Sequence, residues 1–213
     1  LNVIHSNING YKTDGVIDDS IKQHVEIGSD GSIIDTVRIT RKHKGGKTPY
    51  DWWNRVNANY MRVYVPLGSE LISADGQTYE FPESPLDYDA LGFKRDPLVT
   101  AIESAERIDK ESGTRISEES GKTVFGNWVY VSPGEEVTVE YRYKLPFMLT
   151  PGGDTEGSSS YSLLIQKQAG MPGTEVVVEV VYPESFQPIW QTGRNLVPYE
   201  HTFRLNEKLV TDL

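Results

Sequence analysis

Apolar and polar residues alternate through most of the chain, and this pattern predicts β-strands. Apolar residues recur at two-residue spacing in 21–27 and again in 33–39, on either side of the Gly/Asp cluster at 28–31. Alternation on both sides of such a turn is typical of a β-hairpin. The same pattern occurs in 122–131 and 136–145 around SPGEE, where it predicts a second hairpin.

Several further strands are expected along the chain. Residues 59–66 alternate and end at a proline, which cannot donate a hydrogen bond to a ladder. The segments 160–168 and 174–183 flank AGMPG and predict a strand pair. The run 176–181 is largely apolar on both faces, as expected of a central or covered strand. With two short strands on either side of the turn ADGQ at 74–77 and the alternating tail at 199–204, the pattern predicts about ten short strands.

One region breaks the alternation and predicts a helix. The strand register is lost between 82 and 121, and apolar residues lie at helical spacing from Leu98 to Ile108, directly after Asp96-Pro97. This spacing predicts one helix of about ten residues. Because crossover helices are missing, a parallel α/β architecture is excluded. The predicted fold is all-β: an antiparallel, immunoglobulin-like β-sandwich with one short helix in an insertion.

The domain organisation follows from changes in the same pattern. Residues 1–19 are rich in Asn, Gly and Asp and are expected to be a lead-in or linker, with the β-sandwich region spanning 20–213. A strand, a Gly-containing turn and a strand ending in proline occur in 38–66 and again in 163–183. This echo leaves two alternatives open: one large sandwich, or two modules divided near residue 151.

Composition and charge exclude several classes of protein. The 213 residues include no cysteine, which excludes disulfides, Cys-ligated metals and a cysteine nucleophile. The 31 acidic and 21 basic side chains give a formal charge of −10, so nucleic acid is not expected as a partner. No apolar run approaches the roughly 18 residues of a membrane span, so direct membrane insertion by this segment is not expected.

The sequence predicts no catalytic residues, no metal site and no cofactor. The four histidines, at positions 5, 24, 43 and 201, have no metal-ligand spacing, and the pattern places His24 and His43 on solvated strand positions. No G-x-S-x-G string or phosphate-binding glycine motif occurs. The paired carboxylates at 103/106, 118/119 and 135/136 lie in turns, in the predicted helix or beside charged neighbours. We therefore expect a protein that is not an enzyme.

The candidate ligand-binding residues are Tyr50, Trp52 and Trp53 in TPYDWWNRVN. Adjacent tryptophans point in different directions, so at most one is expected to be buried while the other is exposed. An exposed Trp can stack on a sugar ring or anchor a protein partner, and the alternative is that both seal the edge of the sandwich. The basic cluster from Arg41 to Lys47 is interpreted as protection of an edge strand against aggregation.

Three strings carry a resemblance to a known family. NYMRVYVPLGSELISADG, GKTVFGNWVYVSPGEEVTVEYRYKLP and YSLLIQKQAG, in that order and spacing, resemble the carboxy-terminal region of a bacterial family of uncharacterised, membrane-anchored proteins, a numbered domain of unknown function. The match covers roughly residues 16 to 213. The resemblance implies a β-rich module outside the membrane. A looser similarity links the chain to immunoglobulin-like modules of bacterial surface proteins.

From these observations we expect a non-catalytic, extracytoplasmic structural or interaction module of a bacterial surface protein. The expected partner is a protein or a cell-surface glycan, and the expected location is the cell surface. Absent cysteine fits export by a bacterium that does not rely on disulfides. The alternative is a carbohydrate-binding or carbohydrate-processing domain. A third idea, an intramolecular Lys–Asn isopeptide bond, requires a buried lysine. The oligomeric state is left open.

Overall fold

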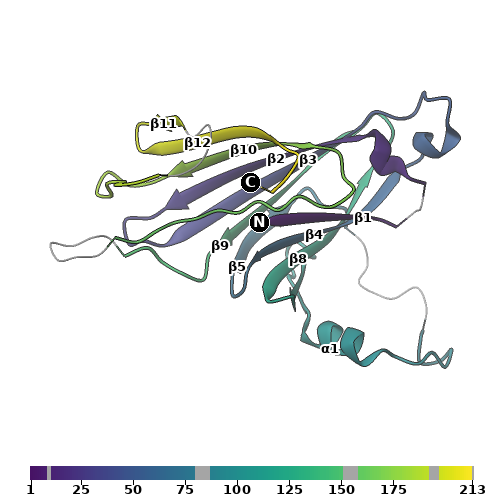
Figure 1. Cartoon of the computed structure of the whole chain (residues 1–213). Helices are drawn as coiled ribbons and strands as arrows, with labels where there is room; N and C mark the ends of the chain where they lie inside the picture. Colours follow the sequence, from purple (N-terminus) through teal and green to yellow (C-terminus); the bar gives the residue numbers. More distant parts are fainter. Residues whose placement is uncertain (9–10, 80–86, 151–157, 192–196, 213) are drawn as a thin grey trace.

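The computed structural model describes residues 1–8, 11–79, 87–150, 158–191 and 197–212, and two β-sheets form its body (Figure 1). Sheet A has the order β1 (Asn2–Asn7), β4 (Asn57–Pro66), β8 (Lys122–Val131), β7 (Arg115–Glu119), β6 (Arg107–Ile108). Sheet B has the order β11 (Val197–Tyr199), β12 (Thr202–Leu209), β10 (Thr174–Val181), β2 (Ile17–Ile27), β3 (Ile33–His43), β9 (Glu136–Lys144), β5 (Glu70–Asp75). The predicted all-β sandwich is confirmed.

One hydrophobic core joins the inner faces of the two sheets. Met61, Val63 and Phe125 of sheet A and Val37 and Tyr141 of sheet B are all fully buried in it. The rings of Phe125 and Tyr141 stack across the core with centroids 6.1 Å apart. Alternate residues of each strand face this core, as the period of a β-strand requires.

The two predicted hairpins have different outcomes. β2 and β3 pair antiparallel over their full length, as predicted for 21–27 and 33–39. β8 and β9 do not pair, because the turn at 132–135 carries the chain from sheet A to sheet B. Alternation shows that one face of a strand is buried. Strands of both sheets in a sandwich have one buried face, so alternation alone does not show which strand is the hydrogen-bonded partner.

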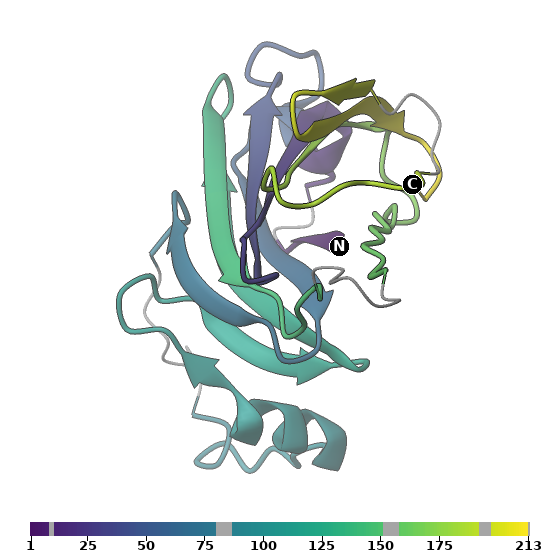
Figure 2. The same cartoon turned by 90° about the vertical axis from the view of Figure 1, so that its left-hand side faces the viewer.

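The strand pair predicted around AGMPG is also not formed. β10 pairs parallel with β2 and antiparallel with β12, so sheet B is mixed and β10 is a central strand, one of the two positions expected for it. Residues 158–168 instead run alongside β1, on the side of the sandwich where both termini lie (Figure 2). Ile165 is buried in the core, and Tyr161 and Leu163 pack against it. The alternation in 161–168 therefore arises because alternate side chains contact the core, although the segment is not a strand of either sheet.

The side chain of Gln168 completes the edge of sheet A. Its Oε1 accepts a hydrogen bond from the His5 N–H at 2.8 Å, and its Nε2 donates to the His5 carbonyl at 2.9 Å. One amide therefore replaces a strand partner and covers an edge that would otherwise be open to strand addition. Residues 2–7, assigned above to a lead-in, thus form the strand β1.

We expect Gln168→Glu to weaken this edge by about 1–2 kcal/mol at pH 7, because the carboxylate cannot donate to the His5 carbonyl. The loss should shrink near pH 4, where the carboxyl group is largely protonated and can donate again. Urea unfolding at both pH values measures the effect. Gln166→Glu, on the exposed side of the same segment, is the matched control, and an equal loss in both variants would contradict the assigned role.

The remaining elements lie outside the sandwich core. The helix α1 (Pro97–Ala105) confirms the predicted short helix, and the Asp96 carboxylate caps it by accepting hydrogen bonds from the Leu98 and Val99 N–H groups. Position 151, where a division was considered, lies outside the described residues, and β10 and β12 beyond it belong to the same sheet as β2. No helix in the described ranges is long and apolar enough to cross a membrane.

Candidate functional site

The structure brings the three predicted aromatic residues together on the loop 44–56 between β3 and β4, which we call the aromatic loop. The ring of Tyr50 lies 4.9 Å from that of Trp52 and 5.0 Å from that of Trp53, measured between centroids. Tyr50 and Trp52 are 44% and 47% exposed, whereas Trp53 is half-buried. Neither tryptophan is buried, which agrees with the expectation that at most one of them would be, and their ligand-binding role stays a prediction.

The side chain of Asn54 holds the aromatic loop in shape. Its Oδ1 accepts hydrogen bonds from the Gly46 N–H at 2.7 Å and the Thr48 N–H at 3.0 Å. Its Nδ2 donates to the Thr48 carbonyl at 2.9 Å. Asn54 ends the short 3₁₀ helix η2 (Asp51–Asn54), so these bonds fix the turn that carries both tryptophans. A loop that is ordered before binding loses less conformational entropy when it meets a partner.

His43 binds both ends of the aromatic loop, at Gly45 and at Arg55. The prediction that His43 lies at a solvated strand position is wrong, because the residue is buried. The side chain is 1% exposed. Its Nδ1 accepts from the Gly45 N–H at 3.0 Å, and its Nε2 donates to the Arg55 carbonyl at 2.9 Å. The two contacts require the neutral imidazole with the proton on Nε2. Burial lowers the pKa of His43, which favours this form.

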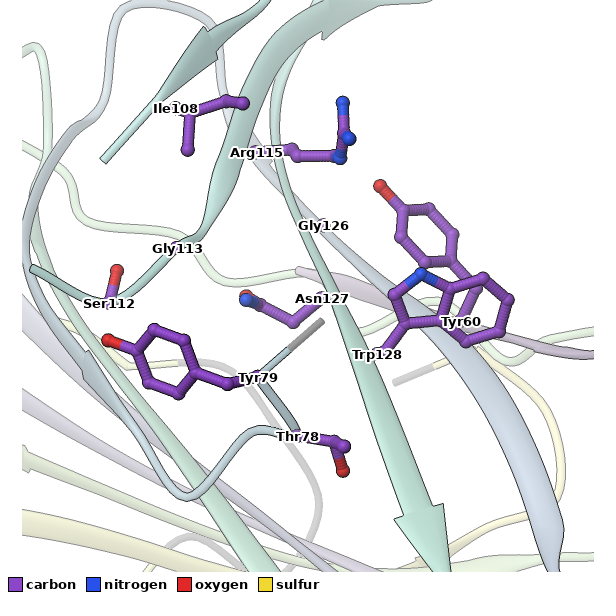
Figure 3. A pocket seen from close by; sticks show the side chains of 10 residues that line it. All are labelled: Tyr60, Thr78, Tyr79, Ile108, Ser112, Gly113, Arg115, Gly126, Asn127 and Trp128. Carbon is purple, nitrogen blue, oxygen red and sulfur yellow. The ribbon is translucent and has the colours of Figure 1, made fainter. Parts of the chain in front are cut away.

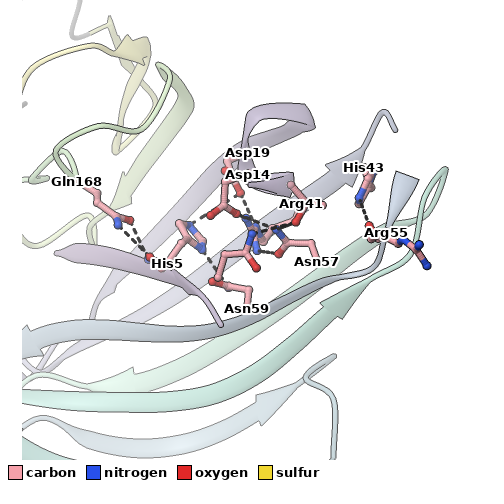
Figure 4. Close-up of polar contacts among 11 residues, drawn as sticks. His5, Asp14, Asp19, Arg41, His43, Arg55, Asn57, Asn59 and Gln168 are labelled. Atoms are coloured by element: carbon pink, nitrogen blue, oxygen red, sulfur yellow. Dashed lines mark hydrogen bonds and ion pairs between the residues drawn. The ribbon is translucent and has the colours of Figure 1, made fainter. Parts of the chain in front are cut away.

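Arg41 lies at the centre of a buried ion cluster, with Asp14, Asp19 and Asn57 around it (Figure 4). The guanidinium is 0% exposed, and it contacts Asp14 and Asp19 at 2.9 Å each and donates to the Asn57 Oδ1 at 2.8 Å. The predicted role of Arg41 in protecting an edge strand is therefore wrong. β3 lies between β2 and β9, and the odd-numbered residues of β3 face inward, so Arg41 and His43 share the face of Ile39.

His5 extends this cluster toward β1. Its Nδ1 accepts from Asn59 Nδ2 at 3.1 Å, and its Nε2 lies 3.9 Å from Asp19 Oδ1. Burial, together with the positive charge of Arg41, lowers the pKa of His5 to about 4. His5 is therefore a neutral, structural histidine at pH 7. Sequence reasoning missed the cluster because its members come from four separate segments.

The ion cluster supports the aromatic loop through Gly15. Gly15 follows Asp14 in the 3₁₀ helix η1 (Thr13–Val16), and a Cβ atom added at Gly15 would lie 3.5 Å from the Trp53 Nε1. The indole of Trp53 therefore packs directly on the backbone that Arg41 holds in place through Asp14. Arg41 thus holds the backbone at Asp14 and Gly15, Trp53 packs on that backbone, and the ring of Tyr50 contacts both Trp53 and the exposed Trp52.

The other candidate chemical groups are engaged elsewhere. His24 contacts Glu179 at 3.0 Å on the outer face of sheet B, and Lys42 contacts Glu136 at 3.2 Å across β3 and β9. Glu119 contacts Arg62 at 3.2 Å. All lysines lie in the described ranges and none is buried, so the buried lysine that an isopeptide bond requires is missing. The described residues hold no group of three or more potential ligands arranged for a metal ion.

A small cleft lies on the outer face of sheet A (Figure 3). Its volume is about 60 Å³, and Tyr60, Arg115 and Trp128 contribute to its walls. The mid-strand Gly126 leaves room for the Tyr60 ring, whose hydroxyl oxygen lies 2.5 Å from the place of a Cβ atom at that glycine. Sites for small molecules usually measure about 300–1,000 Å³, so this cleft is too small to hold a whole substrate.

A wider groove of about 350 Å³ lies at the β2–β3 turn, between Glu26, Arg142 and Tyr182. Arg142 contacts Glu26 there at 3.4 Å, so the two charges offset each other. The groove contains none of the predicted aromatic residues. The three aromatic residues thus lie outside both the cleft and the groove, on the exposed aromatic loop.

Comparisons with known proteins give a distant structural similarity. No family model matches the sequence, and no curated protein matches it. Among solved structures, the chain is similar to an M1 zinc metallopeptidase from Deinococcus radiodurans, with 14% identity and a TM-score of 0.32 over 90% of this chain and 38% of that one. A mutant M1 zinc metallopeptidase bound to a Tyr-Ser-Ala substrate gives 14% identity and a TM-score of 0.33, again over 90% of this chain and 39% of that one. The chain thus spans about two fifths of the length of these peptidases.

Proposed function

We propose that this chain is a non-catalytic, extracytoplasmic interaction module of a bacterial surface protein, and that the aromatic loop is its contact site. One observation carries the proposal: Tyr50 and Trp52 are exposed side by side on a loop that Asn54 and His43 hold in a single shape. Exposed, rigid aromatic residues are the side chains most often responsible for binding energy at protein contact sites.

The locations of the charged side chains support an interaction role and not a catalytic one. Catalytic sites hold perturbed acids and bases in a concave, accessible pocket. Here His5 and Arg41 are buried in the ion cluster, whereas the ion pairs Lys42–Glu136 and Arg142–Glu26 lie on the outer face of sheet B. The extracytoplasmic location rests on the family resemblance and on the absence of cysteine.

The second candidate function is carbohydrate binding, which the Tyr50–Trp52 geometry favours. The two ring planes are inclined by 31°, so the pair offers two neighbouring apolar surfaces that are tilted toward each other. Such surfaces can pack against the apolar face of a sugar ring, and the neighbouring Asp51 and Arg55 can bond its hydroxyl groups. Protein binding and carbohydrate binding would both require the exposed Trp52.

A glycan array and a hydrolase panel, applied to the purified protein and to Trp52→Ala, distinguish the candidates. Trp190→Ala is the matched control, because Trp190 is 77% exposed on a different loop. Saturable glycan binding that is lost only in Trp52→Ala would favour the carbohydrate function. Turnover in the hydrolase panel would overturn the non-catalytic proposal.

The protein-partner form of the proposal is tested in the bacterium that makes the protein. A photo-crosslinking amino acid at position 50 of the full-length protein is expected to trap one discrete partner, and the same amino acid at position 190 is not. Equal crosslinking at both positions, or none at position 50 combined with an empty glycan array, would overturn the aromatic loop as a contact site.

A further inference from the structure

We infer that His43 makes the aromatic loop acid-sensitive: a proton added at Nδ1 breaks the hydrogen bond to Gly45 and releases the end of the loop that supports Trp53. This inference rests on the proposed function, because it concerns the regulation of the same contact site. It starts from the two hydrogen bonds of the buried imidazole, to the Gly45 N–H and to the Arg55 carbonyl.

Only one of these two bonds survives protonation. The Nε2–H that donates to the Arg55 carbonyl is present in both the neutral and the charged imidazole, and the positive charge strengthens it. Nδ1 changes from an acceptor to a donor, so it then faces the Gly45 N–H, which is also a donor. The contact at 3.0 Å becomes repulsive, while the contact with Arg55 is kept.

The loop moves because the histidine backbone is fixed. The His43 N–H donates to the Glu135 carbonyl, and the His43 carbonyl accepts from the Gly134 N–H, both at 2.9 Å. Gly45 is therefore the partner that has to shift. A Cβ atom at Gly45 would lie 1.9 Å from the Trp53 carbonyl oxygen and 2.5 Å from the His43 Cε1, so Gly45 occupies a tight space between the two residues. Displacement of Gly45 displaces the backbone of Trp53.

The charged groups around His43 do not stabilise a protonated imidazole, so protonation is expected to release the aromatic loop. Arg41 lies on the same face of β3, and its positive charge disfavours a second cation there. Asp14 and Asp19 face Arg41 and are engaged by it, so neither carboxylate is free to pair with the imidazolium. The surrounding charged side chains point to other partners: Lys44 to Asp18, Glu135 to the Ser132 N–H and Arg55 to the ring of Tyr11.

NMR of the whole chain tests the inference without a ligand. Two signals are followed between pH 7.5 and 5: the ¹⁵N–¹H resonance of Gly45, and the ¹⁹F resonance of Trp53 in protein labelled with 5-fluorotryptophan. Both are expected to shift with the midpoint of the His43 ring titration, below pH 6.5. Trp128, which lies on sheet A, serves as the internal control.

The matched variant is His43→Gln, whose amide can accept from Gly45 and donate to Arg55 but does not titrate. The Trp53 resonance is expected to stay constant in His43→Gln over the same pH range. An equal shift in this variant would overturn the inference, and so would a wild-type His43 titration that leaves the Gly45 resonance unchanged or an imidazole that stays neutral down to pH 5. If His43→Gln does not fold, the comparison of Gly45 and His43 midpoints in the wild-type protein decides.

The two proposals fail in distinguishable ways. Absence of glycan or protein binding at every pH would overturn the contact site and leave the Gly45 and Trp53 shifts interpretable. If binding is found, it is expected to be weaker at pH 5.5 than at pH 7.5 in the wild-type protein and equal at both in His43→Gln.

Discussion

Asp35→Asn is expected to raise the free energy of unfolding at pH 7 by about 2 kcal/mol and to leave it nearly unchanged at pH 4. Asp35 lies on the inner face of β3 and is only 3% exposed. Burial raises its pKa from 3.8 to about 6, although hydrogen bonds from Tyr143 and Gln23 favour the charged form. An ionised carboxylate in this position therefore opposes folding at neutral pH.

The direction follows from proton linkage. The native state binds the Asp35 proton more tightly than the unfolded state, so this group lowers stability as the pH rises from about 4 to about 6. The shift of about two pKa units corresponds to roughly 3 kcal/mol, and the expected gain is smaller because a neutral amide accepts weaker hydrogen bonds. The new amide also offers a donor near the buried Gln23 Oε1, which has no partner among the described residues.

Urea unfolding of Asp35→Asn and wild type at several pH values between 4 and 7 measures this effect. Asp30→Asn, at the turn of the same hairpin, is the matched control, and its expected effect on stability has the opposite sign. Hydrogen bonds from Ser32 lower the pKa of Asp30, so its removal is expected to decrease stability at pH 7. A loss of stability in Asp35→Asn that is the same at every pH would contradict the assigned role of burial.

The sequence pattern predicted most of the strands but not their partners, and it missed β1. The β2–β3 hairpin was predictable because a short turn leaves two consecutive strands few alternatives to pairing. β8 and β9 show an equally clear pattern, yet they enter different sheets. Both arrangements bury alternate residues, and the choice depends on contacts between distant strands such as β4 and β8. The same limit applies to 161–168, where alternation marks core contacts outside any sheet.

For the candidate site, the aromatic residues were predictable and their support was not. Tyr50, Trp52 and Trp53 are neighbours in sequence and in space. The ion cluster joins Asp14, Arg41 and Asn57 across as many as 43 sequence positions. One signal was present: the odd-numbered apolar residues Ile33, Val37 and Ile39 define the inner face of β3, and Asp35, Arg41 and His43 share that parity. Polar residues on a buried face indicate a network that needs partners.

His5→Gln is expected to gain stability relative to the wild-type protein as the pH falls from 6.5 toward 4. The pKa of His5 is about 4 in the folded protein and 6.5 as its ordinary value, so the unfolded state binds its proton more tightly. This group therefore lowers stability as the pH falls from 6.5 to about 4, by up to roughly 3 kcal/mol. The contribution is opposite in sign to that of Asp35 and covers nearly the same pH range.

The two buried groups are therefore expected to offset each other in the wild-type protein, and each single variant exposes the contribution of the other. Relative to wild type, His5→Gln should lose about 1–2 kcal/mol at pH 7 through a poorer bond to Asn59 and should regain stability toward pH 4. Asp35→Asn should show the reverse slope. The difference curves remove the contributions of all other groups, and the double variant should show the sum of the two, because the residues lie in separate parts of the core. A His5→Gln curve parallel to wild type from pH 7 to pH 4 would mean that the imidazole has the same pKa in the folded and unfolded states, and the ion cluster would then hold a second cation beside Arg41 at pH 4.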